Sequence, residues 1–201
     1  MHRRTAILVA LFALGGFTVA SQVYLLREFL GLFGGNELAL GTVMGLWLLL
    51  SGCGAWLART FPVRKGKESF SLFLLFILSV LPVLTLFKLG LWRTDLLPYG
   101  SMAGIWQIFS ASFLALIPVC ILNGFLFVLL TSLLQDQDKP HAPGRAYSME
   151  SLGGLAGGAL VNFILLWHLP TFVSLRVLLV LFVSFLAICT YFFFQWRGTV
   201  I

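Results

Sequence analysis

The chain has 201 residues and a formal net charge of +6, with 60% hydrophobic and only 10% charged residues. In soluble globular domains about a quarter of the residues are charged, so this composition excludes a soluble domain. The chain is also too apolar to be disordered. Three cysteines without a pairing pattern exclude a disulfide scaffold. The apolar stretches are also longer than the alternating segments of about ten residues found in membrane β-barrels. The composition therefore predicts an all-α, polytopic membrane protein.

Six apolar segments, each about as long as the 20 residues that cross a bilayer, predict six transmembrane helices in a single domain. Polar linkers that carry proline, glycine or clustered charges separate most of them. The most polar linker is QDQDKPHAPGRAYS, between the fourth and fifth segments. The predicted spans are Thr5–Phe33, Asn36–Ala58, Phe70–Leu91, Gly104–Leu133, Met149–Trp167 and Phe172–Trp196.

The basic residues flank these spans, which indicates membrane topology and no nucleic-acid partner. Nine of them fall on one side: Arg3, Arg4, Arg59, Arg64, Lys65, Lys67, Lys139, Arg145 and Arg197. The other four fall on the opposite side: Arg27, Lys88, Arg93 and Arg176. Both termini are therefore predicted to be cytoplasmic, in a multi-pass protein of the bacterial inner membrane. The alternative, a cleaved signal peptide at residues 1–21, fits less well because its apolar run is long.

The first span carries Ser21, Tyr24 and Glu28 at positions i, i+3 and i+7, which places them on one helical face, with Arg27 beside them. Charged groups within a bilayer usually face protein or water, so this face predicts a polar binding pocket. In the alternative interpretation, Arg27 and Glu28 lie near the outer interface and extend their charged ends into it.

Asn36 and Glu37 open the second span, and they also have two interpretations. Asn is a good N-cap, and Glu suits the positive end of the helix dipole, which explains both residues structurally. They could instead join the polar pocket. In the fourth span, Asn123 is expected to form a hydrogen bond between helices.

Small residues at four-residue spacing predict close helix packing in spans two and five. They are Gly41 and Gly45, with Gly52 on nearly the same face, and Gly153, Gly154, Gly157 and Gly158. The pattern Glu-xxx-Gly-xxx-Gly begins at Glu37 and recurs at Glu150, in the second span of each set of three. An odd number of spans per repeat gives an inverted pair, as in many transporter folds, so we expect an inverted 3+3 repeat.

The residues provide no catalytic constellation. The sequence contains no HExxH or CxxC motif, no nucleophile paired with a base, and no soluble domain that could hold a nucleotide. On its residues alone, the chain is expected to be no enzyme and to hold no metal or cofactor.

Three runs resemble a known family: SQVYLLREF at Ser21–Phe29, GNELALG at Gly35–Gly41, and GRAYSMESLGG at Gly144–Gly154. They are similar to the membrane domain of bacterial membrane-bound polyamine aminopropyltransferase (spermidine synthase)-like proteins. In that family a multi-span domain, which looks like half of a major-facilitator transporter, precedes a cytoplasmic catalytic domain. The Gly-rich cofactor loop and acidic residues of an aminopropyltransferase are absent from this sequence. The resemblance therefore implies a membrane module.

Three functions remain open. The first is a non-catalytic membrane subunit that packs against another subunit, a second copy, or a soluble aminopropyltransferase. The second is a carrier or binding module for a small cation such as a polyamine, with Glu28, Glu37 and Glu150 as attracting charges and Tyr24 or Tyr147 as a stacking surface. The third is a part in polyamine aminopropyl transfer itself.

Overall fold

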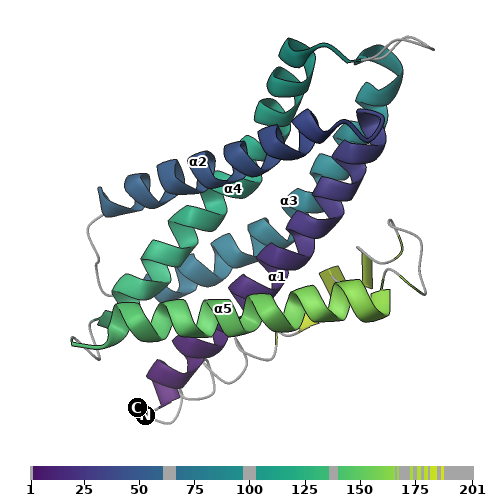
Figure 1. Ribbon diagram of the computed structural model, residues 1–201. Helices are drawn as coiled ribbons and strands as arrows, with labels where there is room; N and C mark the ends of the chain where they lie inside the picture. Colours follow the sequence, from purple (N-terminus) through teal and green to yellow (C-terminus); the bar gives the residue numbers. More distant parts are fainter. Residues whose placement is uncertain are drawn as a thin grey trace.

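The computed structural model describes residues 2–60, 67–96, 103–135 and 140–165, together with a few single positions between 167 and 187. The five long helices are α1 (His2–Leu32), α2 (Glu37–Arg59), α3 (Lys67–Leu96), α4 (Ile105–Gln135) and α5 (Ala142–Leu160). A π-helical turn, Val161–Leu165, continues α5 (Figure 1). No β-strand occurs in these described ranges, which confirms the all-α prediction.

Four helices are long and apolar enough to cross a membrane: Arg4–Leu32, Glu37–Arg59, Ser69–Trp92 and Ile105–Gln135. They match the first four predicted spans to within a few residues. α5 is not among them, because it begins seven residues before Met149 and so includes Arg145 and other polar residues of the preceding segment. Most of the predicted sixth span, Phe172–Trp196, lies outside the described residues.

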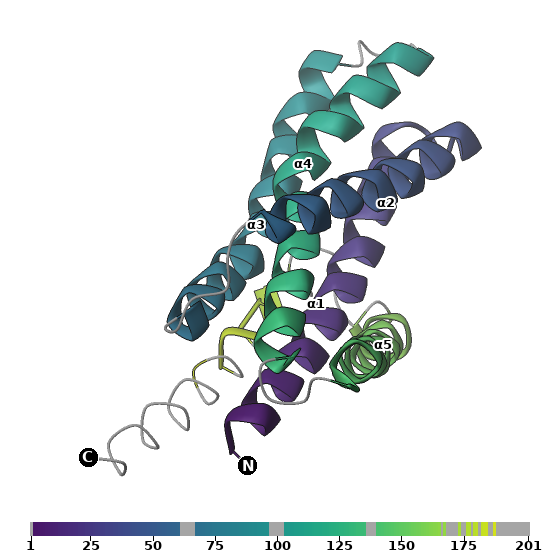
Figure 2. The same ribbon diagram turned by 90° about the vertical axis from the view of Figure 1, so that its left-hand side faces the viewer.

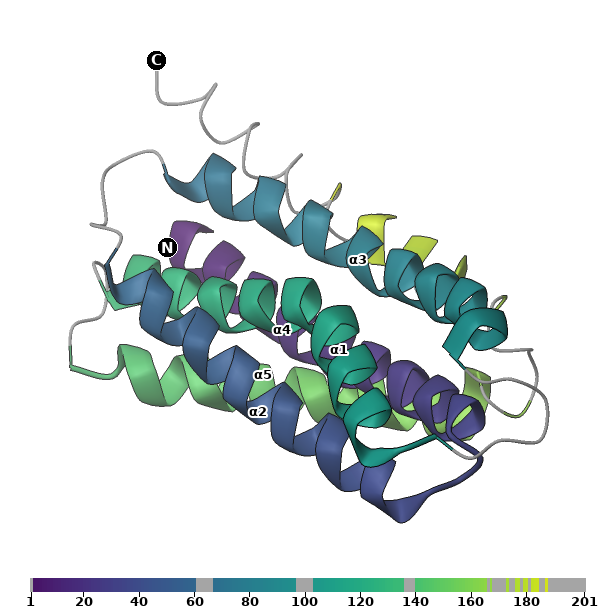
Figure 3. The same cartoon turned by 90° about the horizontal axis from the view of Figure 1, so that it is seen from above.

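Successive helices run in opposite directions, so their ends gather at two opposite sides of the molecule. The view from above shows the start of α1, the end of α2, the start of α3, the end of α4 and the start of α5 on one side (Figure 3). Arg4, Arg59 and Arg145 belong to this group of ends. The alternation is what repeated membrane crossing requires.

The helices form three layers. α1 and α4 lie in the middle, α3 covers one face of them, and α2 and α5 cross the other face (Figures 2 and 3). Apolar side chains fill the space between the layers, and Tyr24, Phe29, Leu116 and Leu126 are among the fully buried ones. Because α1 and α4 are covered on both faces, they contribute most of this core.

Two helix pairs pack most closely, α1 with α5 and α2 with α4. Their contacts run through glycines whose missing side chains let two backbones meet. A Cβ atom at Gly153 would overlap the carbonyl of Phe12, and one at Gly124 would overlap the carbonyl of Ser51. Close backbone approach through glycine is a common way for helices to associate in lipid, where apolar side chains gain little by leaving the acyl chains.

Candidate functional site

Four of the predicted pocket residues lie at the turn between α1 and α2. Asn36 is the N-cap of α2, and its side-chain oxygen accepts a hydrogen bond of 2.9 Å from the backbone N–H of Leu38. Glu37 follows as the first helical residue and is exposed. Arg27 is exposed and Glu28 is partly buried near the end of α1. The structural interpretation of Asn36 is therefore confirmed, and its oxygen is engaged by the cap.

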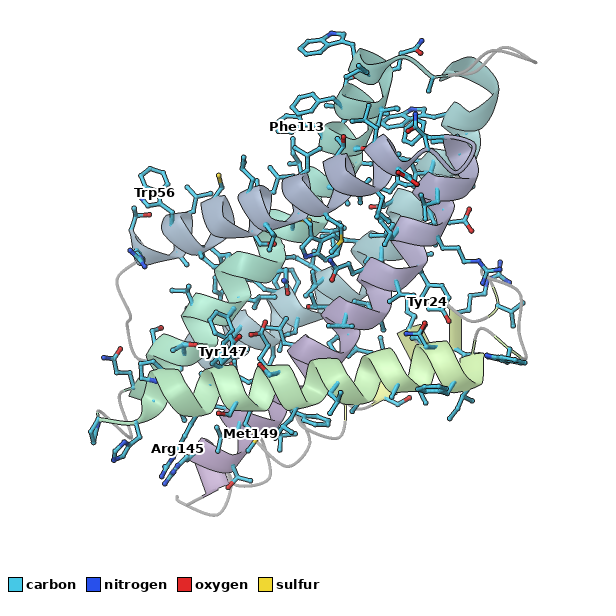
Figure 4. All side chains as sticks on the ribbon, in the orientation of Figure 1. Tyr24, Trp56, Phe113, Arg145, Tyr147 and Met149 are labelled. Atoms are coloured by element: carbon cyan, nitrogen blue, oxygen red, sulfur yellow. The ribbon has the colours of Figure 1, made fainter. Side chains whose placement is uncertain are left out.

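Ser21 and Tyr24, which share the predicted face with Glu28, point into the protein interior. Ser21 is 1% exposed and Tyr24 is fully buried. Figure 4 labels Tyr24 on α1, well away from the start of α5. The predicted polar face of α1 thus exists, and its buried part packs in the core.

One helical turn before Ser21, Thr18 forms a polar contact between α1 and α4. The Thr18 hydroxyl donates a 2.6 Å hydrogen bond to the side-chain oxygen of Asn123 on α4. This confirms the expected interhelical role of Asn123. Two further serine hydroxyls, Ser21 Oγ and Ser112 Oγ, are buried without a hydrogen-bond partner among the described residues. The described part of α1 and α4 therefore contributes one hydrogen-bonded polar pair and two buried serines to the core.

Tyr147 and Glu150 lie elsewhere, near the start of α5. Tyr147 is 66% exposed and Glu150 is partly buried. α1 and α5 run in the same direction and cross where Gly16 meets Gly157. From that crossing, Tyr24 lies about 12 Å toward one end and Tyr147 about 15 Å toward the other, at 1.5 Å per residue. The structure does not bring the eight candidate residues into one pocket (Figure 4).

Glu150 lies against the middle of α1. Its backbone carbonyl is where a Cβ atom at Gly15 would fall, so the two residues are at the same level. Gly15 is about 16 Å along α1 from Arg4. In the part of the chain that the structure describes, the Glu150 carboxylate has neither a hydrogen bond nor an ion pair.

The predicted packing glycines divide into two sets. Gly154, Gly157 and Gly158 pack against α1, where Gly154 and Gly158 contact the Val19 side chain and Gly157 meets the Gly16 backbone. A Cβ atom at Gly41 or Gly45 would meet nothing within 4 Å in the part of the chain that the structure describes. The two Glu-xxx-Gly-xxx-Gly motifs therefore occupy different environments.

Four glycines that carry close contacts were missed by the sequence analysis: Gly15, Gly16, Gly54 and Gly124. The adjacent pair Gly15-Gly16 is a visible signal in the sequence, because it leaves one side of α1 without side chains. Gly54 and Gly124 are single small residues, and their role depends on the neighbour that the fold supplies.

The described residues contain no group of three or more His, Cys, Asp or Glu side chains that could hold a metal ion. The chain matches no family model, no curated protein and no solved structure.

Proposed function

We propose that the protein is a non-catalytic subunit of a membrane complex and that the outer face of α2 packs against a transmembrane helix of its partner. The observation that carries this proposal is the set of three open glycines on α2. Gly41, Gly45 and Gly52 are exposed, and no atom of the described residues lies within 4 Å of a Cβ position at any of them. By contrast, the glycines in the closest helix contacts of this chain each lie against the backbone of another helix.

The three glycines lie on one side of α2. At 100° per residue, Gly41, Gly45 and Gly52 fall within about 40° of one another, opposite Val43 and Gly54, which face α4. Leu48 and Trp56, which are 74% and 66% exposed, border them. A partner helix could approach the α2 backbone along this face as closely as α4 approaches it from the other side.

The finer topology is part of the same proposal. Six spans with both termini in the cytoplasm of a bacterial cell agree with the alternating helices and with the basic residues at one group of ends. An inverted 3+3 repeat agrees with the two close pairs, because exchanging α1 with α4 and α2 with α5 converts one pair into the other. The resemblance to the membrane module of spermidine synthase-like proteins supports the assignment only through the sequence runs given above.

The test is to purify the protein from native membranes in mild detergent and measure the protein mass of the particle by light scattering. We expect a complex with a second chain in fixed proportion, and an at least tenfold loss of that complex in the double variant Gly41→Leu/Gly45→Leu. Gly90→Leu, at an exposed glycine of α3 that also has no neighbour within 4 Å, is the matched control and should keep it. A single 22.3 kDa chain in the wild-type particle would contradict the proposal.

A second function, transport or binding of a small organic cation, is favoured by Glu150. A carboxylate without a partner near the middle of a bilayer is costly, and such residues usually serve ions or substrates. We expect proteoliposomes to take up labelled spermidine, and Glu150→Gln to reduce uptake at least tenfold, whereas Glu37→Gln at the exposed helix end leaves it within twofold. Equal uptake by empty liposomes, or by the Glu150→Gln variant, would reject this role.

A further inference from the structure

An apolar groove lies between α3 and α4, outside every site described above. Its volume is about 310 Å³. Phe70 and Leu74 line it from α3, and Ile117, Pro118, Ile121 and Phe125 line it from α4. Pro118 lies inside α4 and has no N–H to donate to the preceding turn. The groove offers an occupant almost nothing to hydrogen-bond, so its lining suits a hydrocarbon chain.

The start of α3 lies at the end of the groove that Phe70 occupies. Phe70 is three residues, about 4.5 Å, from Lys67, the first residue of α3, whose amino-terminal end also carries the positive pole of the helix dipole. Arg59 ends α2 with an exposed side chain.

The contact between α2 and α4 places Arg59 near the level of the groove. A Cβ atom at Gly54 would overlap the carbonyl of Ile121, whose side chain lines the groove. Arg59 lies five residues, about 7.5 Å, beyond Gly54 toward the same group of helix ends. Because α4 runs in the same direction as α2, this direction leads from Ile121 toward Phe125 and the start of α3.

We propose that this groove binds one acyl chain of an anionic phospholipid, with the phosphate at Arg59 and the start of α3. A neutral lipid tail gains little by leaving the bilayer for an apolar groove, so the charged end provides the selectivity. Basic residues directly beside a membrane span attract anionic lipids, and a helix amino terminus favours a phosphate. The proposal does not depend on the partner helix proposed above, because that helix would pack on the glycine face of α2 and not in the groove between α3 and α4.

The test measures lipid retention by native mass spectrometry on the detergent-purified protein, with dioleoyl phosphatidylglycerol and dioleoyl phosphatidylcholine added at equal concentration. We expect at least a fivefold preference for phosphatidylglycerol. Arg59→Gln/Lys67→Gln should remove the preference, whereas Lys88→Gln, an exposed basic residue near the other end of α3, should keep it. Equal retention of the two lipids by the wild type, or an unchanged preference in the double variant, would overturn the proposal.

A separate variant tests the part of the groove that would hold the acyl chain. Leu74→Trp should fill the groove and lower the retention of both lipids at least fivefold, and Leu84→Trp, at an exposed position on α3, is its control. A millimolar excess of glycerol phosphate should leave the bound lipid in place. Displacement by glycerol phosphate, or full retention in a folded Leu74→Trp protein, would show that the groove holds no tail. The wild-type lipid comparison needs no variant, so it decides the proposal even if Leu74→Trp fails to fold.

Discussion

Replacing Gly153 with leucine is expected to destabilise the protein more than any exposed substitution, because it separates α1 from α5. The added Cβ atom would overlap the carbonyl of Phe12, a backbone atom that cannot rotate away as a side chain can. One turn further, Gly157 meets the backbone of Gly16 in the same way. The helices must therefore move apart along the whole crossing, and the packing between them is lost.

Overpacking a well-filled site costs typically 1–3 kcal/mol and occasionally more, and we expect Gly153→Leu to cost about 3 kcal/mol or more. For a chain of this size that corresponds to a fall in Tm of about 6–12 °C. Thermal unfolding in detergent, followed by tryptophan fluorescence, measures it. Gly144→Leu changes an exposed glycine in the first turn of the same helix and should shift Tm by less than about 2 °C, because surface substitutions change stability by about 0.5 kcal/mol or less. A Gly153→Leu protein with the wild-type Tm would contradict the close crossing.

The sequence predicts the helices well because hydrophobic length needs no knowledge of neighbours. The first four spans follow from runs of apolar residues, and Asn36 follows from the local chemistry of a helix cap. α5 is harder, because its polar first turns and its apolar end form one continuous helix. Its exact start depends on where the chain turns after α4, which the apolar pattern does not encode.

The candidate site is harder to predict, because a helical face says which residues share a side but not what that side meets. Ser21 and Tyr24 lie on one face as expected, yet the fold turns that face into the core. The spacing of Gly41 and Gly45 is the same as that of Gly154 and Gly158, but only the second pair contacts another helix of this chain. Which helix pairs cross, and at which level, comes from the sum of many contacts.

The reciprocal contact of Gly54 and Gly124 leads to a prediction about coupling. A Cβ atom at Gly54 would overlap the carbonyl of Ile121, and one at Gly124 would overlap the carbonyl of Ser51. Both residues therefore hold α2 and α4 at the same close distance. Each single change to alanine should cost about 1–3 kcal/mol, since a methyl group must force two backbones apart.

The double variant Gly54→Ala/Gly124→Ala should cost clearly less than the sum of the two single changes, because helices already separated by one methyl group admit the second. We expect the shortfall to exceed about 1 kcal/mol, measured from unfolding free energies in mixed detergent. Gly124→Ala combined with Gly153→Ala, on different helix pairs, should be additive to within about 0.5 kcal/mol. If the costs are additive in both double variants, Gly54 and Gly124 do not act at one helix crossing. Their role would then not be to allow close packing of α2 and α4.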